Sequence, residues 1–251
     1  MKIIKAKKTK ISEIDFQNLD FGSIFSDHMF SCSFVDGKWD EGTIEPYKPI
    51  LMDPSARTLH YGQACFEGMK AYKDNSGKPW LFRPIENYKR IVKSCKRLAM
   101  PELPEKVFMD GVSKLVDLDK EWIKPGIGNS LYIRPFIFAD QPSINANEAN
   151  QYKFMIICAP AQLYYSGDMK VKIEKSFSRA SKGGVGYAKA AGNYAAQFYP
   201  TMLARDEGYQ QIIWTDSSNH EYIEEAGTMN LFFRINDTLI TPPTNDSILD
   251  G

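Results

Sequence analysis

A glycine-rich stretch around one lysine holds the residues of this sequence that best suit catalysis. Residues 183–194 read GGVGYAKAAGNY, and Lys189 is the only cation among them. Because glycine and alanine add little bulk, a flat ligand can approach the backbone closely here. Burial among small apolar residues favours a neutral lysine, which can attack a carbonyl group or transfer protons. A single lysine is usually a solvated surface residue, so other segments must support this interpretation.

A pair of acids forms the second candidate site. Glu224 and Glu225 stand just before Gly227 and Thr228, and an apolar stretch follows. A carboxylate in a cofactor site can hold a ring nitrogen in its protonated form, which makes pyridoxal phosphate an effective electron sink. Taken alone, two acids at the start of a strand are more often exposed to solvent.

Motifs for other chemistries are weak or missing. The pair Gly184 and Gly186 lacks the third glycine and the preceding strand of a dinucleotide fingerprint. The histidines His28, His60 and His220 are dispersed, so we expect them to be structural donors and predict no metal site. The four cysteines form no Cys-x-x-Cys pair and are expected to be small buried hydrophobes.

Charge and hydropathy restrict the possible partners. The 31 basic residues balance the 31 acidic residues over 251 positions, so no net charge draws the chain to nucleic acid or to an anionic membrane. No apolar run reaches the roughly 18 residues of a membrane span, and the lysine-rich N-terminus lacks the apolar core of a signal peptide. We therefore expect a cytoplasmic protein whose partners are small molecules or protein chains.

The periods of the apolar residues predict an α+β chain in two parts. Helices are predicted at 84–99, 104–119 and 193–207, and Gly208 closes the last of them. Strands are predicted at 30–36, 42–47, 66–72, 80–83, 130–138, 152–159, 170–174, 211–215, 221–223, 229–235 and 238–241. We predict a small N-terminal α/β domain over 1–161, a linker over 162–169, and a second domain from 170 to 251.

Six ordered blocks together resemble the branched-chain amino acid aminotransferases, which are pyridoxal phosphate enzymes of fold type IV. They are FGSIFSDHM at 21–29, HYGQACFEGMK at 60–70, LFRP at 81–84, LYIRP at 131–135, the lysine stretch and the Glu225 stretch. Their order and spacing match the family over nearly the whole chain. The resemblance implies a small α/β domain followed by a larger pseudo-barrel domain that binds the cofactor.

The resemblance also implies which residues bind the cofactor. Lys189 would form a Schiff base with pyridoxal phosphate and then move a proton between the substrate Cα and the cofactor C4′. Glu225 would bind the pyridine nitrogen, and Tyr194 would hydrogen-bond the cofactor O3′. Arg90 would bind the phosphate with its guanidinium fork, and Thr228 would lie beside the cofactor.

Substrate recognition follows in the same way. The resemblance implies that Phe21, Phe66 and Tyr61 form the apolar wall of the pocket. Tyr132 would donate to the α-carboxylate, while Arg134 and Tyr61 would meet the distal carboxylate of glutamate. The implied reaction is ping-pong transfer of an amino group between leucine, isoleucine or valine and 2-oxoglutarate. The family is usually built on a homodimer, which we expect here.

Two departures from the family pattern affect this interpretation. The loop at 142–146 reads PSINA, where the family usually has Pro-Ser-Leu-Gly-Val. The pocket shape and the side-chain preference can therefore differ from those of the family. By the resemblance, family members continue past Gly251 into a loop whose backbone N–H groups hold the phosphate. We therefore expect a C-terminally truncated chain that binds the cofactor poorly by itself.

Two other classes of function stay open. One is a different fold type IV enzyme, either a D-amino acid aminotransferase or an aminodeoxychorismate lyase. The other is a non-catalytic binding or assembly module that kept the fold. Lys189, Tyr194 and Glu225 are all intact, which favours an enzyme, because a binding module has no need of all three residues.

Overall fold

The computed structural model describes residues 1–163 and 168–251, and its fold is α+β as predicted. The chain forms two compact units, one before and one after the residues that are not described. The predicted linker at 162–169 lies partly outside the described residues, so the proposed domain limits stay a prediction. No helix among the described residues is long and apolar enough to cross a membrane.

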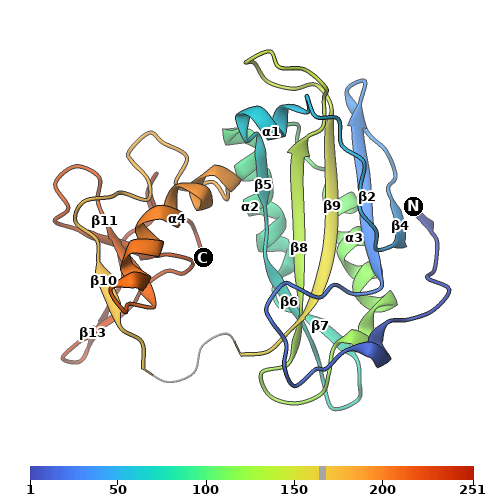
Figure 1. The fold of residues 1–251 in the computed structure, drawn as a ribbon, viewed down its shortest axis with the longest axis horizontal. Helices are drawn as coiled ribbons and strands as arrows, with labels where there is room; N and C mark the ends of the chain where they lie inside the picture. The colour runs from blue at the N-terminus through green and yellow to red at the C-terminus, as the bar shows by residue number, and fades with distance from the viewer. Residues whose placement is uncertain (164–167) are drawn as a thin grey trace. The chain divides into compact units, whose positions relative to one another are not determined.

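The first unit is built on a sheet of nine strands among the described residues (Figure 1). The long central strands are β2 (His28–Val35), β8 (Ser130–Ala139) and β9 (Tyr152–Ala161), which pair antiparallel. The order is β1-β4-β2-β9-β8-β6-β7, with β3 beside β2 and β5 beside β8. The shorter strands are β1 (Lys2–Ile3), β3 (Lys38–Trp39), β4 (Thr43–Pro46), β5 (Ala64–Phe66), β6 (Met69–Lys73) and β7 (Pro79–Leu81).

Two amphipathic helices, both predicted from their apolar periods, cover one face of this sheet (Figure 1). They are α2 (Pro84–Arg97) and α3 (Glu105–Leu118). In the core between sheet and helices, the rings of Phe108 and Phe154 stack with centroids 6.0 Å apart. Alternation along β8 sends Ile133 and Ile137 into this core. The same alternation sends Tyr132 and Arg134 to the opposite face.

Local turn chemistry was also predictable. The turn between β2 and β3 has φ of 52° at Asp36 and 77° at Gly37, a left-handed pair that Asp-Gly adopts readily. The short helix α1 (Arg57–Tyr61) was not predicted, because five residues are too few to show a helical period. Short 3-10 turns lie at η1 (Ile11–Glu13) and η2 (Lys120–Trp122).

His28 has the structural role expected from the sequence. Its Nδ1 lies 2.6 Å from Oδ1 of Asp119, and its Nε2 accepts the backbone N–H of Ala6 at 2.8 Å. Because Nε2 is an acceptor, the ring proton is on Nδ1, where it is donated to Asp119. All four cysteines are buried and reduced, as predicted.

The second unit contains one helix, α4 (Ala191–Asp206), and two small sheets among the described residues. The first sheet has the order β10-β11-β12, formed by Val171–Ile173, Gln211–Thr215 and Ile223–Ala226. The second sheet is the hairpin of β13 (Phe233–Ile235) and β14 (Thr238–Ile240). Gly208, with φ of 86°, follows α4 as predicted.

The predicted strand at 221–223 was wrong in its position. The structure has β12 at Ile223–Ala226, so both acids lie inside the strand. Glu224 and Glu225 are buried there, at 8% and 4% exposure. Hydropathy alone places a pair of acids outside a buried strand, whereas partners contributed from distant segments stabilise them inside it.

The α3 core provides a test of the fold. Leu115 is fully buried, and replacing it with alanine leaves a cavity that is expected to lower the free energy of unfolding by about 2–5 kcal/mol. The matched control is Leu51→Ala, because Leu51 is 98% exposed and should change stability by less than about 0.5 kcal/mol. Urea unfolding followed by tryptophan fluorescence measures both. Equal losses would contradict the placement of α3.

Candidate active site

The lysine stretch is held against the first turn of α4. Nδ2 of Asn193 donates to the carbonyl oxygens of Val185 at 2.9 Å and Ala188 at 3.0 Å. At Gly186 the backbone passes so close to residues 246 and 247 that an added Cβ would lie 2.6 Å from Cα of Ser247. The glycine is therefore required for packing, which fixes the segment just before Lys189.

Lys189 and Tyr194 are in contact in the second unit. Nζ of Lys189 donates a hydrogen bond to Oη of Tyr194 at 2.8 Å, and both side chains are half-buried. The five-residue separation works because Lys189 precedes the helix while Tyr194 lies in its first turn. An amine next to a phenol is an arrangement in which protons can be shared and a reactive nitrogen oriented.

Glu225 supplies a buried carboxylate to the same unit. One of its oxygens, Oε1, forms an ion pair with Nη2 of Arg179 and accepts the backbone N–H of Leu249 at 3.2 Å. Burial raises the pKa of Glu225 to about 7, while the charges of Arg179 and Lys189 act to lower this pKa. The carboxyl group therefore changes charge near neutral pH, which is unusual for a glutamate and typical of functional sites.

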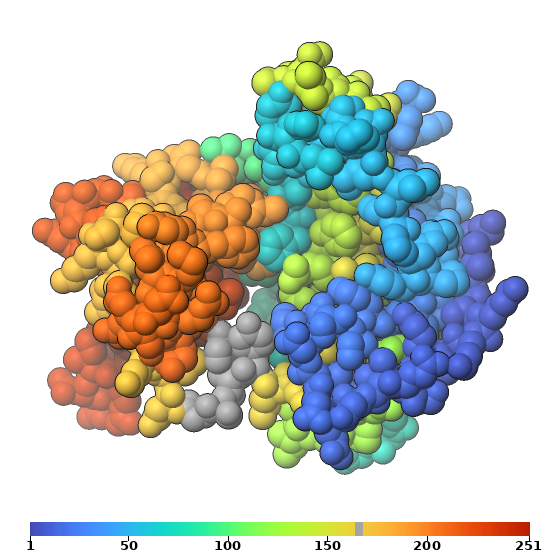
Figure 2. Space-filling view, viewed as in Figure 1, coloured from blue at the N-terminus to red at the C-terminus, as the bar shows by residue number. Residues whose placement is uncertain are grey.

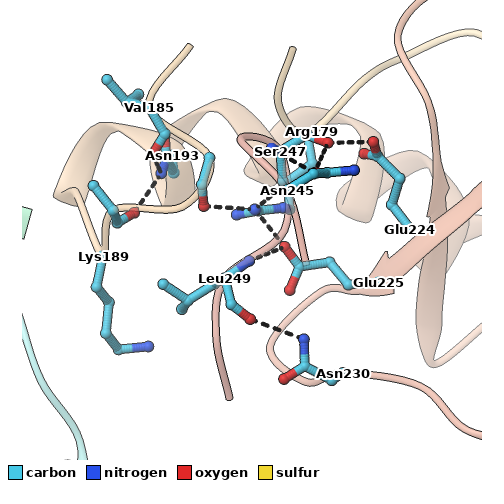
Figure 3. Close-up of polar contacts among 12 residues, drawn as sticks. Arg179, Val185, Lys189, Asn193, Glu224, Glu225, Asn230, Asn245, Ser247 and Leu249 are labelled. Atoms are coloured by element: carbon cyan, nitrogen blue, oxygen red, sulfur yellow. Dashed lines mark hydrogen bonds and ion pairs between the residues drawn. The ribbon is translucent and has the colours of Figure 1, made fainter. Parts of the chain in front are cut away.

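Arg179 was missed by the sequence analysis. A lone arginine ten residues before Lys189 has no spacing that distinguishes it from a surface cation. In the structure it is 7% exposed and lies between Glu225 and the lysine stretch (Figure 3). Glu224 is the other buried acid, and the hydroxyl of Ser247 contacts its Oε1.

Thr228 lies in the tight turn after β12. The backbone groups of Ala226 and Met229 pair across this turn, at 3.0 Å from Ala226 N to Met229 O. Gly227 and Thr228 form the tip, where Thr228 is exposed. The turn thus follows directly from the strand that carries Glu225.

The first unit brings together four of the aromatic and basic residues predicted to bind substrate. Nη2 of Arg134 donates to Oη of Tyr132 at 2.9 Å, and its Cζ lies 4.5 Å from the ring centroid of Phe66. The ring of Phe21 meets that of Tyr132 edge to face, with centroids 5.1 Å apart. Gly68 makes room for the phenol, since an added Cβ would lie 2.2 Å from Oη of Tyr132.

A cavity of about 140 Å³ opens beside this cluster. Its lining is mostly apolar and consists of Phe21, Gly22, Phe25, Tyr132, Arg134, Ile157, Cys158 and Ala159. Oη of Tyr132 accepts from Arg134, so its own proton is left to donate elsewhere. Nε of Arg134 is buried without a hydrogen-bond partner among the described residues. An apolar cavity lined by a phenol and a guanidinium suits a small molecule that carries a carboxylate.

Tyr61 lies with a different group of residues. Its ring is 48% exposed, and its hydroxyl donates to the carbonyl of Ile144 in the loop that departs from the family pattern. Nη1 of Arg57, at the other end of α1, donates to the carbonyl of Asn147 at 3.0 Å. Figure 2 shows α1, in cyan, side by side with this yellow-green loop. The helix that was not predicted therefore holds the loop.

Arg90 forms a two-pronged ion pair. Its Nε and Nη2 donate to the two carboxylate oxygens of Glu67 at 2.7 and 2.8 Å. Glu67 is fully buried, and Nδ2 of Asn87 also donates to it at 2.8 Å. This pairing orients the guanidinium on the polar side of α2. Glu67 stands inside the block HYGQACFEGMK, but nothing in the sequence paired it with Arg90.

The ten predicted site residues thus fall into one group in each unit. Lys189, Tyr194, Glu225 and Thr228 belong to the second unit. The first unit holds the others, namely Phe21, Tyr61, Phe66, Arg90, Tyr132 and Arg134. Their roles toward cofactor and substrate stay predictions.

Known proteins resemble this chain over most of its length. The profile of the class IV amino-transferase family matches residues 64–251. The branched-chain-amino-acid transaminase 1 of Bacillus subtilis is 42% identical over 100% of this chain and 72% of the relative. A probable branched-chain-amino-acid aminotransferase of Staphylococcus epidermidis is 46% identical over 94% of this chain and 67% of the relative.

A solved structure agrees with these relatives in fold. It is the branched-chain amino acid aminotransferase of Thermobaculum terrenum in its PLP-bound holo form. The TM-score is 0.70 at 18% identity, over 89% of this chain and 69% of that one. The likeness establishes a shared fold.

The pKa of Glu225 makes stability depend on pH. Since folding raises this pKa from 4.5 to about 7, the neutral carboxyl group is favoured in the folded chain. The resulting stability is complete below pH 4.5 and is lost as the pH rises to about 7. Relative to Glu225→Gln, which does not titrate, we expect wild type to lose up to about 3 kcal/mol over this range. Urea unfolding at several pH values measures the difference, and a constant difference would contradict the assignment.

Proposed function

This chain belongs to the class IV amino-transferase family, and on that premise we propose that it transfers the amino group between branched-chain amino acids and 2-oxo acids. We propose pyridoxal phosphate as the cofactor. The observation that carries the proposal is the buried carboxylate of Glu225 in the same unit as the contact between Lys189 and Tyr194.

The residues of the second unit fit this cofactor. Glu225 offers a buried carboxylate whose charge changes near neutral pH, as suits a partner of a pyridine nitrogen. Lys189 offers an amine and Tyr194 a phenol within 2.8 Å of each other. Arg90 of the first unit, oriented by Glu67, is the residue we propose to bind the phosphate. Thr228, at the turn after β12, would lie beside the ring.

Lys189 would carry the proton transfers. When bound, pyridoxal phosphate supplies an aldehyde that condenses with amines and a ring that stabilises negative charge on the substrate Cα. With its amine released and neutral, Lys189 would take the proton from Cα and later return it as a general acid. Tyr194 would hold Nζ in place through the observed hydrogen bond. One amino acid leaves as its oxo acid, and a second oxo acid receives the amino group.

The cavity of the first unit would select the substrate. Phe21 lines this cavity and would supply apolar surface for an aliphatic side chain, with Phe66 next to it against Arg134. The proton of Tyr132 would be donated to the α-carboxylate. Arg134 would pair with the distal carboxylate of glutamate. Tyr61 could assist only by giving up the hydrogen bond that its hydroxyl donates to Ile144. The stacking of Arg134 on Phe66 allows one pocket to accept both kinds of side chain, because the guanidinium presents an apolar face as well as donors.

The alternatives have less support. One relative named above is a branched-chain-amino-acid transaminase and the other a probable one, which favours this function over a D-amino acid aminotransferase or an aminodeoxychorismate lyase. A binding or assembly module would not require the contact between Lys189 and Tyr194. The homodimer expected from the resemblance stays a prediction.

Replacing Lys189 tests the cofactor proposal. Pyridoxal phosphate added to the chain should give a visible absorption band that leucine shifts. Lys189→Ala should lose the band and at least about a hundredfold in transamination rate, because it removes both nucleophile and proton carrier. The matched control is Lys182→Ala, which changes the exposed lysine just before the lysine stretch.

The same spectrum should be recorded for a second chain, extended by the residues of the Bacillus subtilis relative that follow the matched region. This control accounts for the chain spanning 72% of that relative. Absence of the band from both folded chains would refute the proposal.

Arg134→Met tests the substrate pocket. Loss of a hydrogen bond to a charged group costs about 1.5–3 kcal/mol, so the KM for glutamate should rise about 10- to 100-fold. The KM for leucine, which has no distal carboxylate, should change much less. Steady-state kinetics measures both KM values, and the KM for leucine is the control. Equal losses for both would show that Arg134 serves the α-carboxylate or the cavity as a whole.

A further inference from the structure

Arg179 joins three segments that are far apart in the sequence. Its Nη2 donates to the carbonyl of Gly186 at 2.8 Å and to the carbonyl of Ser247, and it forms the ion pair with Glu225 (Figure 3). These partners lie in the lysine stretch, in the loop after β14 and in β12. One buried nitrogen therefore sets the position of the carboxylate relative to the lysine stretch.

A short stretch of backbone connects the contact of Arg179 with Gly186 to Lys189. Gly186 stands three residues before Lys189, and the added Cβ that would clash with Ser247 shows how closely this segment packs. Asn193 holds the same segment through Val185 and Ala188. Because Arg179 holds the carbonyl of Gly186 and Asn193 holds those of Val185 and Ala188, the segment has little freedom to move away from Glu225.

The charges around Glu225 make Arg179 important for its ionisation. Burial disfavours the charged carboxylate, and the neighbouring Glu224 adds to this effect. Two cations oppose it, and the effect of Arg179 is larger than that of Lys189. A guanidinium suits this position because it stays charged at any pH at which proteins are folded.

Arg179 also leaves one donor unused. Its Nε is buried and has no hydrogen-bond partner among the described residues. Such a donor costs free energy. The contacts of Nη2 with Gly186, Ser247 and Glu225 must offset this cost.

We propose that Arg179 is a positioning residue that keeps Glu225 as an oriented carboxylate for the ring nitrogen of the cofactor. The inference rests on the proposed function, since Glu225 would contact that nitrogen. Arg179 itself would touch neither cofactor nor substrate. It would act through Glu225 and through the backbone of the lysine stretch.

The direct test follows the protonation of Glu225 in the cofactor-free chain. Glutamate labelled with ¹³C at the side-chain carboxyl is titrated by NMR, and the Glu225 signal is assigned by its loss in Glu225→Gln. In Arg179→Met the titration midpoint should rise by about one to three pH units, which is the effect of an adjacent arginine on a carboxyl group. Arg179→Lys should return it part of the way, because a lysine restores the charge without the fork.

The second readout is cofactor affinity. Pyridoxal phosphate binding is measured by the visible band at about pH 8, in whichever of the two chains described above gives that band. Arg179→Met should weaken binding at least about tenfold, which corresponds to the loss of about one charge-assisted hydrogen bond. Arg234→Met is the matched control, because Arg234 belongs to the same unit and its side chain is 78% exposed.

The outcomes separate the two proposals. An unchanged Glu225 midpoint in Arg179→Met, or a changed midpoint with unchanged affinity, would overturn the role of Arg179. Failure of the wild-type chains to bind pyridoxal phosphate would overturn the proposed function, while the titration would still report on the ion pair. If Arg179→Met does not fold, Arg179→Lys and the double variant with Glu225→Gln replace it. The double variant must fold better than Arg179→Met for the pairing to hold.

Discussion

The site residues of the second unit are organised around the contact between two buried side chains, Arg179 and Glu225. Taking either charge out of water alone would cost several kcal/mol, so each requires the other. The pair also explains why β12 can contain an acid at a buried position. Three segments come together at Arg179, and the lysine stretch is one of them. The contact that accompanies the burial of Glu225 therefore also holds the lysine stretch next to β12.

The first unit also combines polar site residues with an apolar core, and it places them on opposite faces of one sheet. Alternation along β8 sends apolar residues to α2 and α3 and leaves Tyr132 and Arg134 on the other face. The helices stabilise the sheet, while the opposite face is left to hold a cavity with polar donors. Glu67 then orients Arg90 as Arg179 orients Glu225, through a buried partner of opposite charge. In both units a charged site residue is held by a second charged residue.

The proposed chemistry depends on groups that are poorly solvated. A carboxylate that titrates near pH 7 and a lysine beside a phenol are sensitive to small changes in their surroundings. The turn at Gly227 and Thr228 continues directly from the strand of Glu225, and the bridge between Ala226 and Met229 ties its base to that strand. Rigid supports of this kind fit a site that must move protons between fixed atoms.

The sequence by itself determined the α+β class, helices α2, α3 and α4, most strands and the order of the family blocks. These features follow from local periods, turn residues and motif spacing, which are visible in any single segment. Only the tertiary structure decided the position of β12, the presence of α1 and the partners Arg179 and Glu67. The reason is physical. A buried charge is stable only next to a partner, and the partner comes from a distant segment that no local pattern can identify.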